Sequence, residues 1–204
     1  MKKYKNIVFD MGNVLLDFSP HNIVSKFTTD QNQIHTLVHE IFLKQEWLDL
    51  DQGIMDEEEA FNSITERIDQ EYSVLVRNIL NHWHESLVER DEMINLLEIL
   101  KLKGYKLYLF SNASKRFYTY YKNFKCLTFF DQMIISADIK HSKPSKEFYS
   151  IASNLCQIEL QESFFIDDSA QNILNANRMG MDGYIHNGSY RLLYQYLQNL
   201  NIID

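Results

Sequence analysis

The second half of the chain alternates short apolar runs with longer segments of helical periodicity, and this alternation restricts the folds that are open to it. Apolar runs that predict strands lie at 105–110, 133–135, 164–166 and 184–185, and one more lies near the N-terminus at 7–9. Between these runs, apolar residues recur every three or four positions, which is typical of amphipathic helices. Strands that alternate with helices form a parallel sheet with helices on both faces. The sequence therefore predicts an α/β core.

A different pattern fills residues 18–90, directly after the first strand. One predicted helix there carries apolar residues at i, i+3, i+4, i+7 and i+8, namely Ile34, Leu37, Val38, Ile41 and Phe42. Asp56, followed three residues later by Glu59, predicts a capping box at the start of another helix. We expect no strand in this segment. The prediction is a helical bundle at 18–90, inserted into a core made of residues 1–17 and 91–204.

Two helix ends in the core are predicted from single residues. Asp91 is expected to be the N-cap of a helix that ends at Gly104, because an aspartate before an apolar repeat and a glycine after it are common helix boundaries. Pro144 is expected in the first turn of the helix around Phe148, where a proline costs no hydrogen bond.

The charge balance and the cysteine content limit the partners and the compartment. The chain of 204 residues has 20 Lys and Arg against 28 Asp and Glu, a net charge of −8. Such an acidic chain is not expected to bind nucleic acid or an anionic membrane surface. Cys126 and Cys156 are its two cysteines and lack metal-ligand spacing, which favours a reducing compartment. No apolar run reaches transmembrane length, so we expect a cytoplasmic protein.

Polar residues follow the predicted strands and would meet at one edge of the sheet. Asp10, Ser111 and the pair Asp167-Asp168 each come at a strand end, and Lys143 lies in a loop after another strand. The carboxyl ends of parallel strands share one edge, where ligands of open α/β sheets bind. Three neighbouring carboxylates raise each other's pKa unless a cation lies among them, and oxygen ligands alone suit Mg²⁺. Lys143 and Ser111 would then hold the oxygens of a phosphate.

Taken singly, each of these residues has a plainer interpretation. A strand-end Asp, Ser or Lys is more often a turn or surface residue than a catalyst. The Asp167-Asp168 pair before a helix is often only an N-cap. Their joint position at one edge favours chemistry instead, with Asp10 as the natural nucleophile that would form an aspartyl-phosphate.

Four stretches in order, FDMGNVLLD, LFSNAS, KHSKPSKEFY and FIDDSAQN, resemble the four motifs of the haloacid dehalogenase-like hydrolase superfamily. The helical insert lies where the first subfamily (subfamily I) has its cap. The first motif is most similar to that of bacterial phosphatases related to α-D-glucose-1-phosphate phosphatase. The resemblance implies a Rossmann-like core, a helical cap, a Mg²⁺ cofactor and a phosphomonoester hydrolase. Its substrate would be a small phosphorylated metabolite, for which a sugar phosphate such as a hexose 1-phosphate is one choice.

The resemblance also implies a role for each motif residue. The nucleophile would be Asp10. The metal ligands would be Asp10, the Gly12 carbonyl, Asp167 and Asp168. Phosphate would be bound by Ser111, Asn112 and Lys143, with Lys143 also taking part in catalysis. Asn172, one helical turn beyond Asp168, would support the metal ligands from behind.

Gly12 departs from the usual pattern of the superfamily. Most of its phosphatases carry a second aspartate two positions after the nucleophile, which serves as general acid and base. Here that position is Gly12, so the proton donor has no assignment in the motifs. His21 is one alternative, although a surface role is more common for such a residue. In the cap, Trp47, Asp51 and Gln52 are expected to line the substrate cavity, with packing as the alternative for Trp47.

Three other functions compete with the phosphatase. Haloacid dehalogenases proper also lack the second aspartate, but they use no metal and resemble Ser and Asn at Asp167-Asp168. A response-regulator receiver has its acidic pair early in the chain rather than late. A non-catalytic module that binds phosphate or protein would explain Gly12 but not the retained motif residues.

His35 and His39 are spaced i, i+4 as zinc ligands are, yet no third ligand accompanies them, which favours a solvent-side pair.

Overall fold

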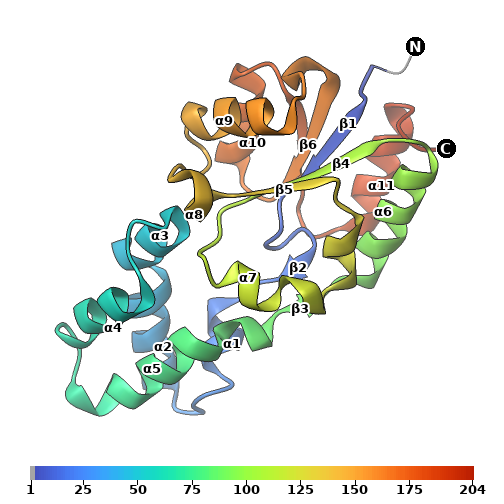
Figure 1. Ribbon diagram of the computed structural model, residues 1–204. Coiled ribbons are helices and arrows are strands. Elements are labelled where there is room, and N and C mark those ends of the chain that lie inside the picture. Colours follow the sequence, from blue (N-terminus) through green and yellow to red (C-terminus); the bar gives the residue numbers. More distant parts are fainter. Residues whose placement is uncertain (1–2) are drawn as a thin grey trace.

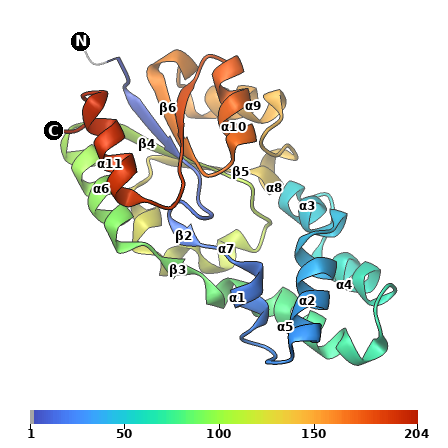
Figure 2. The ribbon, with the colours of Figure 1, turned by 180° about the vertical axis from the view of Figure 1, so that it is seen from behind.

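The protein is a three-layered α/β core with a group of helices at one end. The computed structural model describes residues 3–204, so residues 1 and 2 of the predicted core lie outside it. Five parallel strands form the central sheet in the order β5-β4-β1-β6-β7 (Figures 1 and 2). Their bounds are β1 Asn6–Phe9, β4 Lys106–Ser111, β5 Gln132–Ile135, β6 Ser163–Asp167 and β7 Asp182–Ile185. The predicted Rossmann-like sheet is confirmed.

Helices cover both faces of the sheet because successive strand residues point to opposite sides. In β1, Val8 packs in one apolar cluster, and Ile7 and Phe9 pack in another. The helices α9 and α10 lie on the Val8 side, and α6 and α11 lie on the other (Figures 1 and 2). Their bounds are α6 Asp91–Leu102, α9 Lys146–Cys156, α10 Ala170–Arg178 and α11 Tyr190–Asn199.

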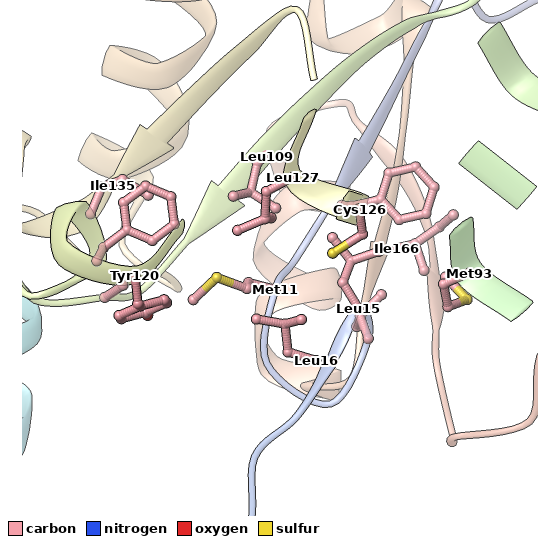
Figure 3. Close-up of a cluster of buried hydrophobic side chains, with 14 of the residues drawn as sticks. Met11, Leu15, Leu16, Met93, Leu109, Tyr120, Cys126, Leu127, Ile135 and Ile166 are labelled. Atoms are coloured by element: carbon pink, nitrogen blue, oxygen red, sulfur yellow. The ribbon is translucent and has the colours of Figure 1, made fainter. Parts of the chain in front are cut away.

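The loop after β1 turns back under the sheet. Figure 3 shows its apolar residues Met11, Leu15 and Leu16 among Leu109 of β4 and Ile166 of β6. Burial of these side chains anchors the loop that carries Gly12, because fully burying a Leu or Met side chain contributes about 1.5–3 kcal/mol.

Helices and helical turns make up most of residues 18–90 and gather at one end of the molecule (Figure 1). They are α1 Pro20–Val24, α2 Gln31–Leu37, the π-helix Val38–Phe42, α3 Gln45–Gln52, α4 Glu57–Thr65, the 3₁₀ turn Gln70–Tyr72, α5 Ser73–His82 and the 3₁₀ turn Trp83–Ser86. The predicted capping box is present, since the Asp56 carboxylate accepts from the Glu59 amide and the Glu59 carboxylate accepts from the Asp56 amide.

A small second sheet corrects the expectation of no strand in this segment. β2 Leu16–Asp17 pairs antiparallel with β3 Val88–Glu89. Two residues are too few to show an alternating pattern, so only the pairing reveals β3. The Arg90 guanidinium adds an ion pair of 2.6 Å to Asp17 beside it. These strands enter and leave the helical segment, and the division at 17 and 91 stays our proposed domain boundary.

Two predicted helix ends were wrong, and one predicted helix is shorter. Asp91 is the first helical residue rather than the N-cap, because the extended Arg90 is held by a hydrogen bond from its amide to the Leu15 carbonyl. Pro144 precedes the helix, whose N-cap is Ser145. After β4, α7 Phe117–Tyr120 ends early and continues as the 3₁₀ turns Tyr121–Asn123 and Lys125–Phe129. α8 Ser136–Ile139 follows β5 directly.

Within residues 3–204, none of the helices combines the length and the apolar character that crossing a membrane requires.

Candidate active site

Asp10 and Asp167 lie next to each other at the carboxyl edge of the sheet. β1 and β6 are parallel neighbours in which Phe9 pairs with Ile166, so the following residues are also neighbours. The Asp10 amide donates to the Ile166 carbonyl at 2.9 Å, which fixes the start of the loop. The Asp167 side chain is fully buried and the Asp10 side chain is 12% exposed.

Lys143 bridges these two carboxylates from the loop after α8. Its Nζ lies 2.6 Å from Asp10 Oδ1 and 2.7 Å from Asp167 Oδ2, and its side chain is 1% exposed. Asn112, which follows β4, binds this loop through both the nitrogen and the oxygen of its side-chain amide. Its Nδ2 donates to the Lys143 carbonyl at 2.9 Å, and its Oδ1 accepts from the Lys143 amide at 2.8 Å. The buried ammonium is therefore fixed by the backbone as well as by its ion pairs.

Burial and like charge control the titration of this group. The pKa of Asp10 is raised to about 7, because burial and the carboxylates of Asp167 and Asp168 together outweigh the lowering effect of Lys143. Burial alone would lower the pKa of Lys143, but the two carboxylates outweigh burial and raise it. The site therefore carries more negative charge than one lysine can neutralise.

Three carboxylates lie close enough together to hold a metal ion. Asp10, Asp167 and Asp168 each offer an oxygen, and these oxygens lie within 4.8 Å of one another. Asn172 donates from Nδ2 to both oxygens of Asp167 at 3.0 Å, and Asn13 donates to Asp168 at 3.2 Å. A set of hard oxygen donors with excess negative charge fits Mg²⁺ better than a softer metal.

A cavity of about 180 Å³ joins this cluster to the helical segment. Its polar lining consists of Asp10, Gly12, Asp51, Asn112, Lys143 and Asn172. Its apolar lining consists of Met11, Leu16, Phe18, Trp47, Trp83, Leu87, Ala113 and the ring of Tyr120. The rings of Phe18, Trp47 and Tyr120 all pack on Trp83, with centroid distances between 5.2 and 5.8 Å. The cavity is thus polar at the sheet edge and aromatic toward the cap.

Most of the predicted site residues come together, but some do not line the cavity. Ser111 is buried at the end of β4, where its hydroxyl makes only a long 3.5 Å contact with the Asn112 carbonyl, and it lies outside the cavity lining. Gln52 is also outside and instead donates to Ser142 at 2.9 Å. His21, His35 and His39 line a separate surface hollow.

Tyr120 is a cavity residue that the sequence did not reveal. Its position in an aromatic stripe with Phe117 and Phe124 is what a packing residue also has, so the pattern alone predicts only burial. In the structure its hydroxyl is buried and has no hydrogen-bond partner within residues 3–204. Such a group usually finds a partner, and Tyr120 lines the cavity in which a bound molecule could supply one.

Comparison with known proteins relates this chain to a family of hydrolases. The family model of the haloacid dehalogenase-like hydrolases matches residues 7–185. A sesquiterpene phosphatase of Aspergillus oryzae is 23% identical over 181 residues, covering 88% of each chain. A HAD family enzyme of Bacteroides thetaiotaomicron, solved in complex with magnesium and inorganic phosphate, matches with a TM-score of 0.72 at 24% identity, covering 91% of this chain and 96% of that one.

An L-2-haloacid dehalogenase of Xanthobacter autotrophicus also matches, with a TM-score of 0.64 at 16% identity, covering 88% of this chain and 76% of that one. At these identities the solved structures establish the fold, which phosphatases and dehalogenases share. The family model spans the central sheet from β1 to β7 and includes every residue of the acidic cluster. The chain therefore belongs to the haloacid dehalogenase-like hydrolases.

Proposed function

We propose that this hydrolase is a Mg²⁺-dependent phosphatase that cleaves a small phosphate monoester through an aspartyl-phosphate on Asp10. The observation that carries the proposal is the buried Lys143 ammonium between Asp10 and Asp167, with Asp168 completing an acidic cluster at the same edge. One ammonium against three carboxylates leaves room for a divalent cation and, with it, for the charge of a phosphate.

The residues divide the work as follows. Asp10 Oδ attacks the phosphorus, the bond to the ester oxygen breaks, and the phosphoryl group is carried on Asp10 until water releases it. Lys143 orients the Asp10 carboxylate and offsets the negative charge of the transferred group. Asp10, the Gly12 carbonyl, Asp167 and Asp168 would hold Mg²⁺, whose charge would act in the same direction.

Neighbouring residues support these groups. Asn172 keeps the Asp167 carboxylate in place through its two hydrogen bonds. Asn112 positions Lys143 through two hydrogen bonds to the Lys143 backbone, and the second N–H of its Nδ2 remains a proposed phosphate ligand. Ser111, at the end of β4, remains a proposed phosphate ligand that would require its hydroxyl to turn toward Asp10.

The acidic pair favours a phosphatase over a dehalogenase. A dehalogenase would use Asp10 without a metal, which would leave Asp168 beside Asp167 with Lys143 as the cation bonded to the cluster. Burial and the neighbouring Asp167 already raise the pKa of Asp168. A metal ion would remove this unfavourable charge, whereas dehalogenation would not.

The residues of the cavity wall indicate what kind of leaving group the site can accept. Away from the sheet edge, the polar groups of its lining residues are the Asp51 carboxyl, the Tyr120 hydroxyl and the indole N–H groups of Trp47 and Trp83, and the rest of that wall is apolar. A hexose 1-phosphate would bring several hydroxyls that need partners. A compact leaving group with an apolar face fits this wall better, and both substrate types belong in the test.

The test is phosphate release from a panel of sugar phosphates, alkyl phosphates and aryl phosphates, each measured with Mg²⁺ and with a chelator. We expect turnover only with Mg²⁺, and a loss of at least ~10³-fold in kcat for Asp10→Asn, which cannot form the covalent intermediate. Unchanged turnover in Asp10→Asn would overturn the mechanism, and metal-free halide release from a 2-haloacid would favour the dehalogenase.

A further inference from the structure

The cavity holds few groups that can give a proton to a leaving alcohol. Asp10 is committed as nucleophile and Lys143 is held between two carboxylates. Gly12 has no side chain where most phosphatases of the superfamily carry their general acid. The remaining proton-bearing groups of the lining are the Asp51 carboxyl and the Tyr120 hydroxyl. Burial raises the pKa of Tyr120 far above neutrality, so this phenol stays protonated and cannot serve as a base.

Hydrogen bonds connect the C-terminal end of α3, which carries Asp51, to the core. The Ser136 hydroxyl of α8 donates to the Asp51 carbonyl, and the Lys140 ammonium donates to the Gly53 carbonyl. Gln52 donates to Ser142, the residue next to Lys143. Although Asp51 belongs to the helical segment, its position is therefore set by the same loop that sets Lys143.

The surroundings of Asp51 suit a group that must gain and lose a proton. Burial, and next the negative charge of Asp10, raise its pKa to about 7, while a hydrogen bond from the Ser114 amide lowers it. A general acid that later acts as a base works best with a pKa near the working pH. Tyr120, whose buried hydroxyl has no hydrogen-bond partner within residues 3–204, lines the same cavity as Asp51. The Tyr120 hydroxyl would be a hydrogen-bond donor for an oxygen of a molecule bound in this cavity.

We infer that Asp51 is the general acid and base of the reaction, supplied by the cap in place of the side chain that Gly12 lacks. The inference rests on the proposed phosphatase activity. In the first step, Asp51 gives its proton to the ester oxygen as the bond from phosphorus to that oxygen breaks, which releases the neutral alcohol. In the second step, the Asp51 carboxylate takes a proton from the water that attacks the aspartyl-phosphate. Phosphate leaves, and Asp10 and protonated Asp51 are regenerated.

The test compares two phosphate esters that differ in their need for a proton. Nitrophenolate leaves readily as an anion, whereas benzyl alcohol must be protonated. In Asp51→Asn we expect kcat/KM for benzyl phosphate to fall ~10²–10⁴-fold and that for p-nitrophenyl phosphate to fall less than ~10-fold. Asp49→Asn is the matched control, because Asp49 lies on the same helix, bonds to Gln45 and is outside the cavity lining.

A second variant tests whether Asp51→Asn loses activity because it lacks a carboxyl group. A side chain at Gly12 has room, since an added Cβ would meet only the Phe18 Cβ, at 3.9 Å. We expect Gly12→Asp in the Asp51→Asn background to regain benzyl phosphate turnover. Circular dichroism and retained p-nitrophenyl phosphate turnover show that Asp51→Asn is folded, and Asp51→Ser repeats the comparison if it is not.

The outcomes separate this inference from the proposed function. Wild-type protein that releases phosphate from neither ester, nor from the wider panel, would overturn the phosphatase itself. Active wild-type protein whose Asp51→Asn variant loses the same factor with both esters, or keeps full turnover of benzyl phosphate, would overturn only the role of Asp51.

Discussion

Lys143 carries a buried positive charge, which is stable only with negative charges next to it. An ammonium that is 1% exposed is stable only because Asp10 and Asp167 lie within 2.7 Å of it. Removing one partner of a buried ion pair costs about 3–5 kcal/mol, because the other charge stays buried without compensation. Lys143 should therefore hold the metal-free site together as well as act on phosphate.

We expect Lys143→Met to lower the free energy of unfolding by about 3–5 kcal/mol in EDTA at pH 8, measured by urea denaturation. The loss should shrink toward pH 5. Burial raises the pKa of Asp10 to about 7, so a fall in pH through this value protonates the carboxyl and removes the charge that Lys143 compensates.

Lys146→Met is the control for this change. Lys146 lies three residues away, is 80% exposed and makes only a 4.0 Å contact with Glu147. Its loss should cost no more than about 0.5 kcal/mol at either pH. A Lys143→Met variant as stable as this control at pH 8 would contradict the structural role of the ammonium.

The sequence predicts residues at strand ends better than it predicts a cavity residue in α7. Asp10 and Asp167 could be placed together because a parallel sheet brings strand ends to one edge, whatever the loops do. Tyr120 could not, because its exposure to a cavity depends on how α7 packs against Trp83 from the cap. Neighbouring tyrosines at 118 and 121 carry the same local signal and line no part of this cavity.

At the scale of elements, the C-terminal end of α3 approaches the core closely at a glycine. α3 ends at Gly53, which has a left-handed φ of +64°. A Cβ at Gly53 would lie 2.6 Å from the Ala137 carbonyl oxygen, a backbone atom that cannot rotate away. Glycine at this position therefore permits both the helix end and the close packing on α8.

Gly53→Ala and Gly104→Ala form a matched pair. Gly104 also follows a helix with a positive φ of +79°, but a Cβ there would meet nothing within 4 Å. We expect Gly104→Ala to cost about 1 kcal/mol, from backbone strain alone, and Gly53→Ala roughly 2–4 kcal/mol, because the clash adds to the strain. Urea denaturation measures both costs.

The same pair tests the placement of Asp51. Gly53→Ala should reduce turnover of benzyl phosphate more than that of p-nitrophenyl phosphate, since it moves the end of α3 away from the loop of Lys143. Gly104→Ala should leave both rates near those of the wild type. Equal stability of the two variants would show that α3 does not pack against α8 as closely as the structure has it.

Elements of normal length could be predicted from the sequence, whereas very short ones could not. The strands β1, β4 and β6 carry buried aromatic and β-branched runs, and α4 begins with a capping box, so the sequence contains local signals for each. β3 has two residues and exists through its pairing with β2, a contact between residues about 70 positions apart. Such a contact leaves no periodic signal in the chain.

At the scale of the whole molecule, the cap meets the core through apolar and polar contacts around an aromatic cavity. The apolar side chains of both parts belong to one buried cluster, in which Trp83 of the cap packs on Tyr120 of α7. A polar contact besides the end of α3 is that of Arg116, which follows β4 and is 14% exposed. Its guanidinium pairs with Glu57 at the start of α4 and donates to the Asn81 carbonyl of α5 at 2.7 Å. One core residue thus binds two cap helices at once.

This arrangement suits a cap that opens to admit substrate and closes for proton transfer. The polar contacts of Arg116 can exchange with water at little net cost when the cap opens. In this structure Asp51 lines the same cavity as Asp10. Closure of a cap over such a site limits the access of water during transfer. Weaker cap contacts should therefore lower the fraction of molecules that can protonate the leaving group.

Arg116→Met tests this coupling. We expect kcat/KM for benzyl phosphate to fall roughly 3- to 10-fold, since losing a partly buried ion pair shifts the closed population by about 1 kcal/mol. Amide hydrogen exchange should be faster in α3 and α4 and unchanged in the strands of the central sheet. Arg77→Met is the matched control, because the ion pair of Arg77 with Glu58 lies entirely within the cap. If Arg77→Met impairs turnover as much as Arg116→Met does, the effect comes from the fold of the cap rather than from its closure on the core.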